Sequence, residues 1–256
     1  MLSFSFVLEL TKRDFAERFA GSSLGSLWAF IWPLVNLFIY IVIFGQVMGA
    51  RLPGASSVYA YGVYLASGLI AWTAFAQSVS RCSTIFLEKK HLISKVRLSL
   101  PSLLLFVLSA ETVTYLITMA VFFIFLYFAS HPMPHHVLIL PFVYCVQMVF
   151  AFGLGLLAAT LSVFIRDLKE VVGIALQLWF WFTPIVYIRD ILPPIVNKLM
   201  VFNPAYVFIE SCHRIFVFND MPAIKSLMIL TILAHFLAWL AYVVFRYLEK
   251  DVRDFL

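Results

Sequence analysis

The chain has 256 residues, of which 63% are hydrophobic and only 12% are charged. A soluble domain carries about twice that share of charge, so lipid must cover much of this surface and a soluble enzyme is excluded. The net charge of +5 does not indicate nucleic-acid binding, because the basic residues fall at the ends of apolar runs rather than in one patch. The three cysteines lie far apart and give neither a zinc spacing nor a disulfide framework.

The first segment, residues 3–19, places apolar side chains at helical spacing and charged side chains mostly on other faces. This pattern predicts an amphipathic helix in the cytoplasmic membrane interface. Gly21 and Gly25 follow it and allow the chain to bend sharply. Residues 1–28 are therefore predicted to form an interface helix and a turn that leads into the membrane.

A membrane-spanning helix needs about 20 mainly apolar residues, and the chain contains six such runs. These runs are 29–48, 59–80, 102–129, 137–165, 171–188 and 226–245. The sequence predicts an all-α membrane protein with six transmembrane helices in a single transmembrane domain, residues 1–256. Most of the 18 Lys and Arg residues fall on one side of this topology, and positive residues mark the cytoplasmic side. Both termini are therefore expected to be cytoplasmic.

The connection between the second and third spans, residues 86–100, is short, basic and mildly amphipathic. We interpret it as a cytoplasmic coupling helix that docks on a partner, because a loop that only fixes topology needs fewer residues. The residues expected to make this contact are Glu88, Lys89, Lys90, Lys95 and Arg97.

Residues 189–225 contain two apolar pieces, each too short to cross comfortably, separated by Asn203 and Pro204. A single span through both pieces would bury charged residues at mid-membrane, which is costly. An external re-entrant helical hairpin fits better, because protein can shield its broken backbone. Asn203 is then expected to stop one helix and Pro204 to begin the next.

The sequence holds little that points to chemistry. No glycine is followed by lysine, so the chain lacks the loop that binds ATP phosphates in P-loop proteins. Glu210 and His213 form one E-x-x-H pair, but metal sites in helical bundles take this motif from more than one helix. The sequence therefore predicts no metal site.

A carboxylate inside the third apolar run, Glu111, is costly unless it is paired or wetted. Two interpretations compete. Glu111 either faces an aqueous path or hydrogen-bonds nearby hydroxyl groups such as Thr112 or Thr114, and we favour the second.

Aromatic residues make up 17% of the chain. Sugars pack their C–H faces on aromatic rings, so Trp32 and Tyr40 in the first span are candidates for a glycan path. Trp179 and Trp181 in the fifth span are candidates for the same reason. Trp and Tyr at span ends also serve as interface anchors, and the sequence does not separate the two roles.

Three short stretches of this sequence match motifs of a known family. The first is Arg13-Asp14 followed by Ser23-Leu24-Gly25-Ser26-Leu27-Trp28 and Pro33-Leu34. The second is Phe164-Ile165-Arg166-Asp167-Leu168, and the third is Phe202-Asn203-Pro204. Together they resemble the membrane subunits of ABC exporters for cell-surface polysaccharides, the O-antigen, capsule and teichoic-acid permeases. The resemblance covers nearly the whole chain and is strongest for the O-antigen permeases.

This resemblance implies the permease subunit of an exporter for lipid-linked polysaccharide in the inner membrane. It implies a homodimer with two ATP-binding cassette subunits, so ATP and Mg bind the partner and this chain needs no cofactor. The first and fifth spans of both copies would surround the path. Arg13 and Arg18 would meet the lipid's phosphate, since phosphates favour arginine. The external gate would comprise Asn203, Pro204, Glu210 and Arg214.

Other functions stay open. An ABC permease for a drug or small lipid would share the fold and differ in its cavity. An ion-coupled carrier would need several buried ionisable residues at mid-span, and only Glu111 and His235 are candidates. A membrane-embedded enzyme or an assembly scaffold is a further class, but convergent polar groups are scarce inside the spans.

Overall fold

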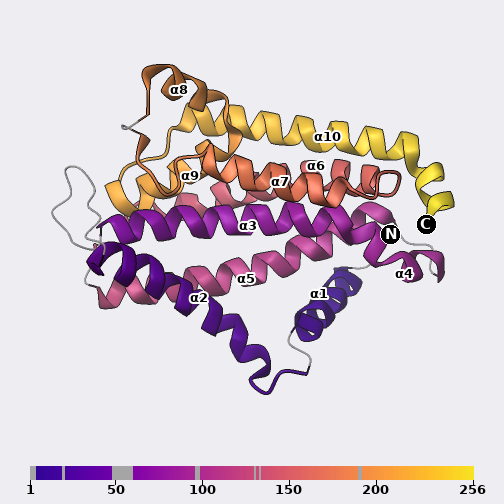
Figure 1. The fold of residues 1–256 in the computed structure, drawn as a ribbon, viewed down its shortest axis with the longest axis horizontal. Coiled ribbons are helices and arrows are strands. Elements are labelled where there is room, and N and C mark those ends of the chain that lie inside the picture. Colours follow the sequence, from indigo (N-terminus) through magenta and orange to yellow (C-terminus); the bar gives the residue numbers. More distant parts are fainter. Residues whose placement is uncertain are drawn as a thin grey trace.

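The regular secondary structure of this chain is helical throughout the part that the structure describes (Figure 1). A computed structural model gives residues 4–18, 21–47, 60–95, 99–129, 131–132, 134–189 and 192–256. Four helices there are long and apolar enough to cross a membrane. They are α3 (Ala60–Glu88), α5 (Leu100–Phe128), α6 (Leu140–Ser162) and α10 (Ile224–Phe255). They run side by side and form the body of the molecule.

Helix α6 lies between α3 and α10, and glycines let it approach both. A Cβ added at Gly155 would come within 2.5 Å of the Cβ of Cys82 on α3. A Cβ added at Gly153 would lie 3.0 Å from the backbone nitrogen of Ala238 on α10. Small residues are the usual means of close helix packing in membranes, because lipid supplies no hydrophobic force between helices.

The first predicted span is helical but not uniformly so. Helix α2 (Trp28–Phe38) continues into a π-helical stretch, η2 (Ile39–Val47). Together they cover nearly the predicted range, whose last residue lies outside the described residues. Neither stretch is among the four long apolar helices, so the count of six spans stays a prediction.

The fifth predicted span, residues 171–188, is shorter than expected. Helix α7 (Leu168–Trp181) ends before Thr183 and Pro184, because proline breaks a helix and disfavours helical geometry in the residue before it. The non-helical backbone that follows is covered by tyrosines of α3. The hydroxyl of Tyr64 donates to the carbonyls of Pro184 and Tyr187, at 3.2 and 3.0 Å. Protein thus supplies the hydrogen bonds that lipid cannot give to irregular backbone.

The segments predicted to face opposite sides of the membrane lie at opposite ends of the helices. Helix α4 (Lys90–Lys95) and the C-terminal end of α10 lie at one end, and α8 (Pro194–Leu199) lies at the other (Figure 1). Helix α1 (Phe4–Arg18) is on the side of α4. In the described residues of the predicted coupling segment 86–100, α3 continues to Glu88, the short α4 follows, and α5 already begins at Leu100.

The second piece of the predicted hairpin packs inside the bundle. Helix α9 (Pro204–His213) buries one face against α3, α6 and α10, and the ring of Phe208 lies 5.2 Å from that of Phe75 on α3. Asn203 caps the start of α9, and Pro204 occupies its first turn, as predicted. The short helix η5 (Met200–Phe202) precedes α9, and the π-helical η6 (Arg214–Phe218) extends it to Asn219, which has a left-handed backbone conformation.

The close approach of α6 to α3 predicts that Gly155→Ala destabilises the protein. The added methyl group has no space beside Cys82, and overpacking of this kind costs about 1–3 kcal/mol. Gly173→Ala on α7 is the matched control, because a Cβ there meets no atom within 4 Å and alanine favours a helix by about 1 kcal/mol over glycine. Thermal unfolding of both variants in detergent checks this. Equal melting temperatures for the two would contradict the packing argument.

Candidate functional site

Four charged residues from three segments form a closed ring at the end of the bundle that carries α4. They are Asp14 and Arg18 of α1, Arg81 of α3 and Glu111 of α5. Arg81 contacts Asp14 at 2.5 Å and Glu111 at 2.7 Å. Arg18 contacts Glu111 at 2.6 Å and Asp14 at 3.1 Å. Every acid in this charge ring therefore lies between two bases, and the ring has no net charge.

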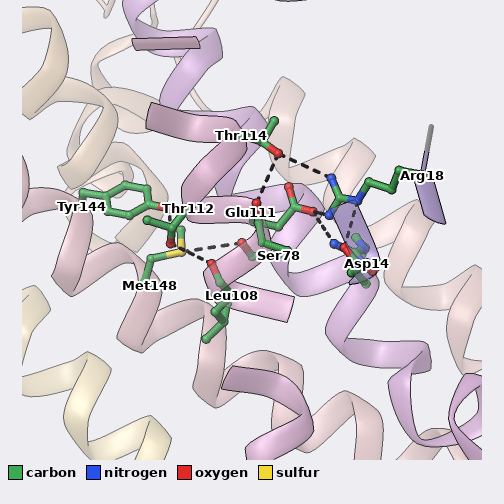
Figure 2. Close-up of polar contacts among 11 residues, drawn as sticks. Asp14, Arg18, Ser78, Leu108, Glu111, Thr112, Thr114, Tyr144 and Met148 are labelled. Carbon is green, nitrogen blue, oxygen red and sulfur yellow. Dashed lines mark hydrogen bonds and ion pairs between the residues drawn. The ribbon is translucent and has the colours of Figure 1, made fainter. Parts of the chain in front are cut away.

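The carboxylate of Glu111 is paired by the two arginines of the charge ring. The expectation that nearby hydroxyl groups provide its hydrogen bonds was wrong. Figure 2 shows Arg18 between Asp14 and Glu111, while Thr112 points away toward Tyr144. The hydroxyl of Thr112 accepts a hydrogen bond from Tyr144 at 3.0 Å and donates one to the carbonyl of Leu108 at 2.7 Å. The side chain of Glu111 is only 5% exposed, so its charge has to be paired, and the two arginines supply that pairing.

Helix geometry explains why these residues meet. Asp14 and Arg18 are four residues apart on α1, so they share one face of that helix. Arg81 reaches the same point because α3 runs past the predicted end at Ser80. In the sequence, Arg81 is one of the Lys and Arg residues that mark the side predicted to be cytoplasmic. The sequence does contain a signal that Arg81 pairs with Glu111. A carboxylate within an apolar run requires a cation, and Arg81 directly follows the preceding span.

A cavity of about 380 Å³ opens beside the charge ring, between α2, η2, α3 and α5. Arg18, Arg81 and Glu111 line one part of it. Polar groups and aromatic rings make up much of the remainder: Trp32, Asn36, Tyr40, Thr73, Gln77, Thr114, Tyr115 and Thr118. The volume falls within the usual range for ligand sites, roughly 300–1,000 Å³. This cavity can therefore hold a molecule that has both apolar and polar parts.

The four aromatic candidates for a glycan path lie in three different places. Trp32 and Tyr40 line the polar cavity. Trp179 packs edge-on against Phe75 at 5.5 Å, within the aromatic core. Trp181 lies on the surface with 59% of its area exposed. One chain therefore does not bring the four rings together around a single space.

The side chain of Asn203 connects α7 to α9. Its carbonyl oxygen accepts hydrogen bonds from the indole of Trp179 at 2.7 Å and from the backbone N–H of Ala205 at 3.0 Å. Its amide nitrogen donates to the hydroxyl of Thr183 at 3.0 Å. Asn203 therefore fixes the end of α7 and the start of α9 relative to each other.

The other candidates for the external gate form a polar cluster. Glu210 accepts hydrogen bonds from Arg214 at 2.9 Å and from the hydroxyl of Tyr206. Arg189 donates to that same hydroxyl at 3.0 Å. His213 does not join Glu210, because its buried ring stacks on Tyr64 with the centroids 3.7 Å apart. The two residues of the E-x-x-H pair therefore have different partners, Arg214 for Glu210 and Tyr64 for His213.

The candidates for partner docking lie around α4. Lys89 is 3.8 Å from Glu17 of α1 and its ammonium lies 6.0 Å from the ring of Phe106 on α5. A hydrogen bond from Arg13 and, to a smaller extent, the charge of Lys89 lower the pKa of Glu17. Lys90 and Lys95 are exposed, and Glu88 accepts a hydrogen bond from Thr84. Arg97 lies outside the described residues.

Burial of the charge ring predicts that Glu111→Gln is strongly destabilising. The change leaves two arginines with one carboxylate, and removing one partner from a buried ion pair costs about 3–5 kcal/mol. Glu249→Gln is the control, because Glu249 also lies between two arginines, Arg246 and Arg253, but at a more exposed place on α10. We expect it to cost less than about 1 kcal/mol. Thermal unfolding in detergent checks the difference, and equal losses would show that the ring is not effectively buried.

Known proteins resemble this chain along most of its length. The protein family described as ABC-2 type transporter matches residues 6–217. The O-antigen export system permease protein RfbA of Klebsiella pneumoniae is 30% identical over 84% of this chain and 81% of that protein. A protein of the same name from Myxococcus xanthus is 27% identical over 97% of this chain and 94% of its own length. Because the family match covers well over half of the residues, this chain belongs to the ABC-2 type transporter membrane family.

Proposed function

We propose that this chain is the transmembrane subunit of an ATP-driven exporter that moves lipid-linked polysaccharide, of the O-antigen type, from the cytoplasm across the inner membrane. One observation carries the proposal: relatives called O-antigen export permeases match nearly the whole chain and nearly their own full length. Two copies of the chain form the pathway. Two separate ATP-binding cassette subunits hydrolyse ATP, and the chain itself is not an enzyme.

The short helix α7 supports a homodimer. Its 14 residues extend about 21 Å at 1.5 Å per residue, less than the roughly 30 Å of a bilayer's hydrocarbon core. The irregular backbone that follows α7 is covered within the same chain. Helix α7 itself exposes Ile174, Leu178 and Trp181, and α2 exposes Phe30 and Phe38. A second copy that packs against these apolar faces places the pathway between the two copies.

Helix α4 supports an ATP-binding partner on the cytoplasmic side. Buried Ile93 anchors α4 to the bundle, while Lys90 and Lys95 point outward. Lys89 connects its start to α1 through Glu17. A partner that contacts the exposed lysines can therefore push on α3 and α1 through this short helix.

The charged residues support a head-group site at the interface helix. Arg13 is largely exposed and pairs with Glu17 at 2.7 Å, so it is open to a lipid phosphate. Arg18 is held in the charge ring at the edge of the polar cavity. We place the lipid's phosphate near Arg13 first, with Arg18 at the entrance to the cavity, where aromatic and hydroxyl groups suit the first sugars.

Purification of the tagged chain from its native membranes tests the assignment. We expect an ATP-binding subunit to copurify in equal amount, and its ATP hydrolysis to rise with lipid-linked glycan. The chain purified alone is expected to hydrolyse no ATP, because it lacks a phosphate-binding loop. Stimulation by small lipids or drugs instead of glycan would identify a different ABC permease. Absence of any such subunit after mild crosslinking would contradict the exporter.

Replacement of exposed tryptophans tests the glycan path. We expect the double variant Trp32→Ala and Trp181→Ala to export polysaccharide several-fold more slowly with an unchanged melting temperature, because loss of ring-stacking contacts costs about 1 kcal/mol each. Trp239→Ala on α10 is the matched control, since Trp32, Trp181 and Trp239 are 61%, 59% and 60% exposed. Export is measured as glycan reaching the outside of intact cells. Equal rates for the double variant and the control would remove these rings from the path.

A further inference from the structure

Two ion pairs join the interface helix α1 to the end of α3. Arg81 contacts Asp14 at 2.5 Å, and Lys89, just after α3, contacts Glu17 at 3.8 Å. Asp14 and Glu17 lie about one turn apart, so both are on one side of α1. This helix thus presents acidic groups to two basic residues of the segment that leads into α4.

The charge ring also joins α1 to α5, through Arg18 and Glu111 at 2.6 Å. Each charge in the ring lowers the cost of burying its neighbours, and a lost contact leaves a buried charge partly uncompensated. A partly opened ring is therefore unfavourable. Because intermediate arrangements are unfavourable, the ring is expected to be either fully formed or fully open. Conformational switches require two such discrete states.

The charge ring includes Arg81, which lies on the helix directly connected to α4, so a movement of α4 acts on the ring. Helix α3 continues from Arg81 to Glu88, and α4 begins at Lys90. Glu111 belongs to α5, which is a different helix with its own packing. A displacement of α3 relative to α5 therefore acts directly on the contact between Arg81 and Glu111, which is 2.7 Å long.

We propose that Arg81 is the positioning residue that transmits a displacement of α4 to α1, and that the charge ring is the latch that this displacement opens. The source of the displacement, an ATP-binding partner on α4, rests on the proposed function. Helix α1 packs against α5, so a movement of α3 that separates Arg81 from Glu111 pulls on α1 through the two ion pairs that join it to α3. Arg18, Arg81 and Glu111 line the polar cavity, so its entrance changes at the same moment.

The test compares variants of the full chain in complex with its ATP-binding partner. The double variant Asp14→Asn and Arg81→Gln removes one acid together with one base, so the ring stays neutral and the pair of Arg18 and Glu111 remains. This design leaves no uncompensated charge in the ring, so we expect the fold to be preserved. Arg81→Lys is the conservative variant that keeps the charge. Arg246→Gln is the matched control, because it removes an arginine from an exposed ion pair on α10.

Two readouts separate transmission from stability. The first is polysaccharide exported per ATP hydrolysed in membrane vesicles. The second is the distance between spin labels that replace Ala16 on α1 and Ser80 on α3, both exposed, in a chain whose exposed Cys145 is replaced by serine. The distance is recorded with and without a non-hydrolysable ATP analogue. A purely structural defect would lower both ATP hydrolysis and assembly, whereas a transmission defect leaves them in place.

We expect the double variant to hydrolyse ATP but to export roughly tenfold less per ATP, within the usual range of coupling between sites. In this variant, the distance between the two spin labels is expected to be broadly distributed and to stay the same with and without the ATP analogue. Arg81→Lys should recover part of the export, and Arg246→Gln should match the unaltered chain. Unchanged export per ATP in the double variant, or a label distance that still follows the nucleotide, overturns the proposal.

The proposal can also fail independently of the proposed function. If the unaltered complex hydrolyses no ATP, the exporter assignment fails, and the label distance in the chain alone then decides on the latch. A broader distribution in the double variant than in the unaltered chain supports the charge ring as the link between α1 and α3. Identical distributions reject it.

Discussion

A charge buried between helices must be neutralised by a partner, and the helices around Glu111 are arranged to meet that requirement. Two arginines contact the carboxylate of Glu111, which is almost fully buried. One of them comes from α3 and the other from α1, so α1 becomes attached to the interior of the bundle. Asp14 then balances the second positive charge. This one carboxylate thus connects α1, α3 and one end of the polar cavity.

Local patterns predicted the elements of this fold better than their contacts. The long apolar runs identified α3, α5, α6 and α10, because burial in lipid demands length and low polarity. Asn203 and Pro204 marked the start of α9 correctly, since capping depends only on neighbours in sequence. The predicted end of the fifth span, residue 188, lies beyond the end of α7 at Trp181. The apolar run continues past Pro184, but the proline ends the helix. Tyrosines of α3 make that early end tolerable, and they are distant in sequence.

The charge ring shows where sequence reasoning stops. The favoured expectation for Glu111 named hydroxyl groups within a turn of it, yet Arg18 is 93 residues away along the chain. A rule that a buried acid needs a base identifies the kind of partner but not which of the 18 basic residues it is. That choice depends on how α1, α3 and α5 pack together. Likewise, the polar cavity contains Trp32 and Tyr40 but not Trp179, a division that follows from packing rather than from composition.

The junction at Asn203 also resists chemical ageing. Asparagine side chains lose their amide when the backbone nitrogen of the next residue attacks the side-chain carbonyl and a cyclic imide forms. The next residue here is Pro204, whose backbone nitrogen carries no hydrogen to lose, so the neutral imide cannot form. Conversion to aspartate would remove the amide that donates to Thr183 and add a charge beside Trp179. The proline that starts α9 therefore also preserves, over the lifetime of the protein, a side chain that connects α7 to α9.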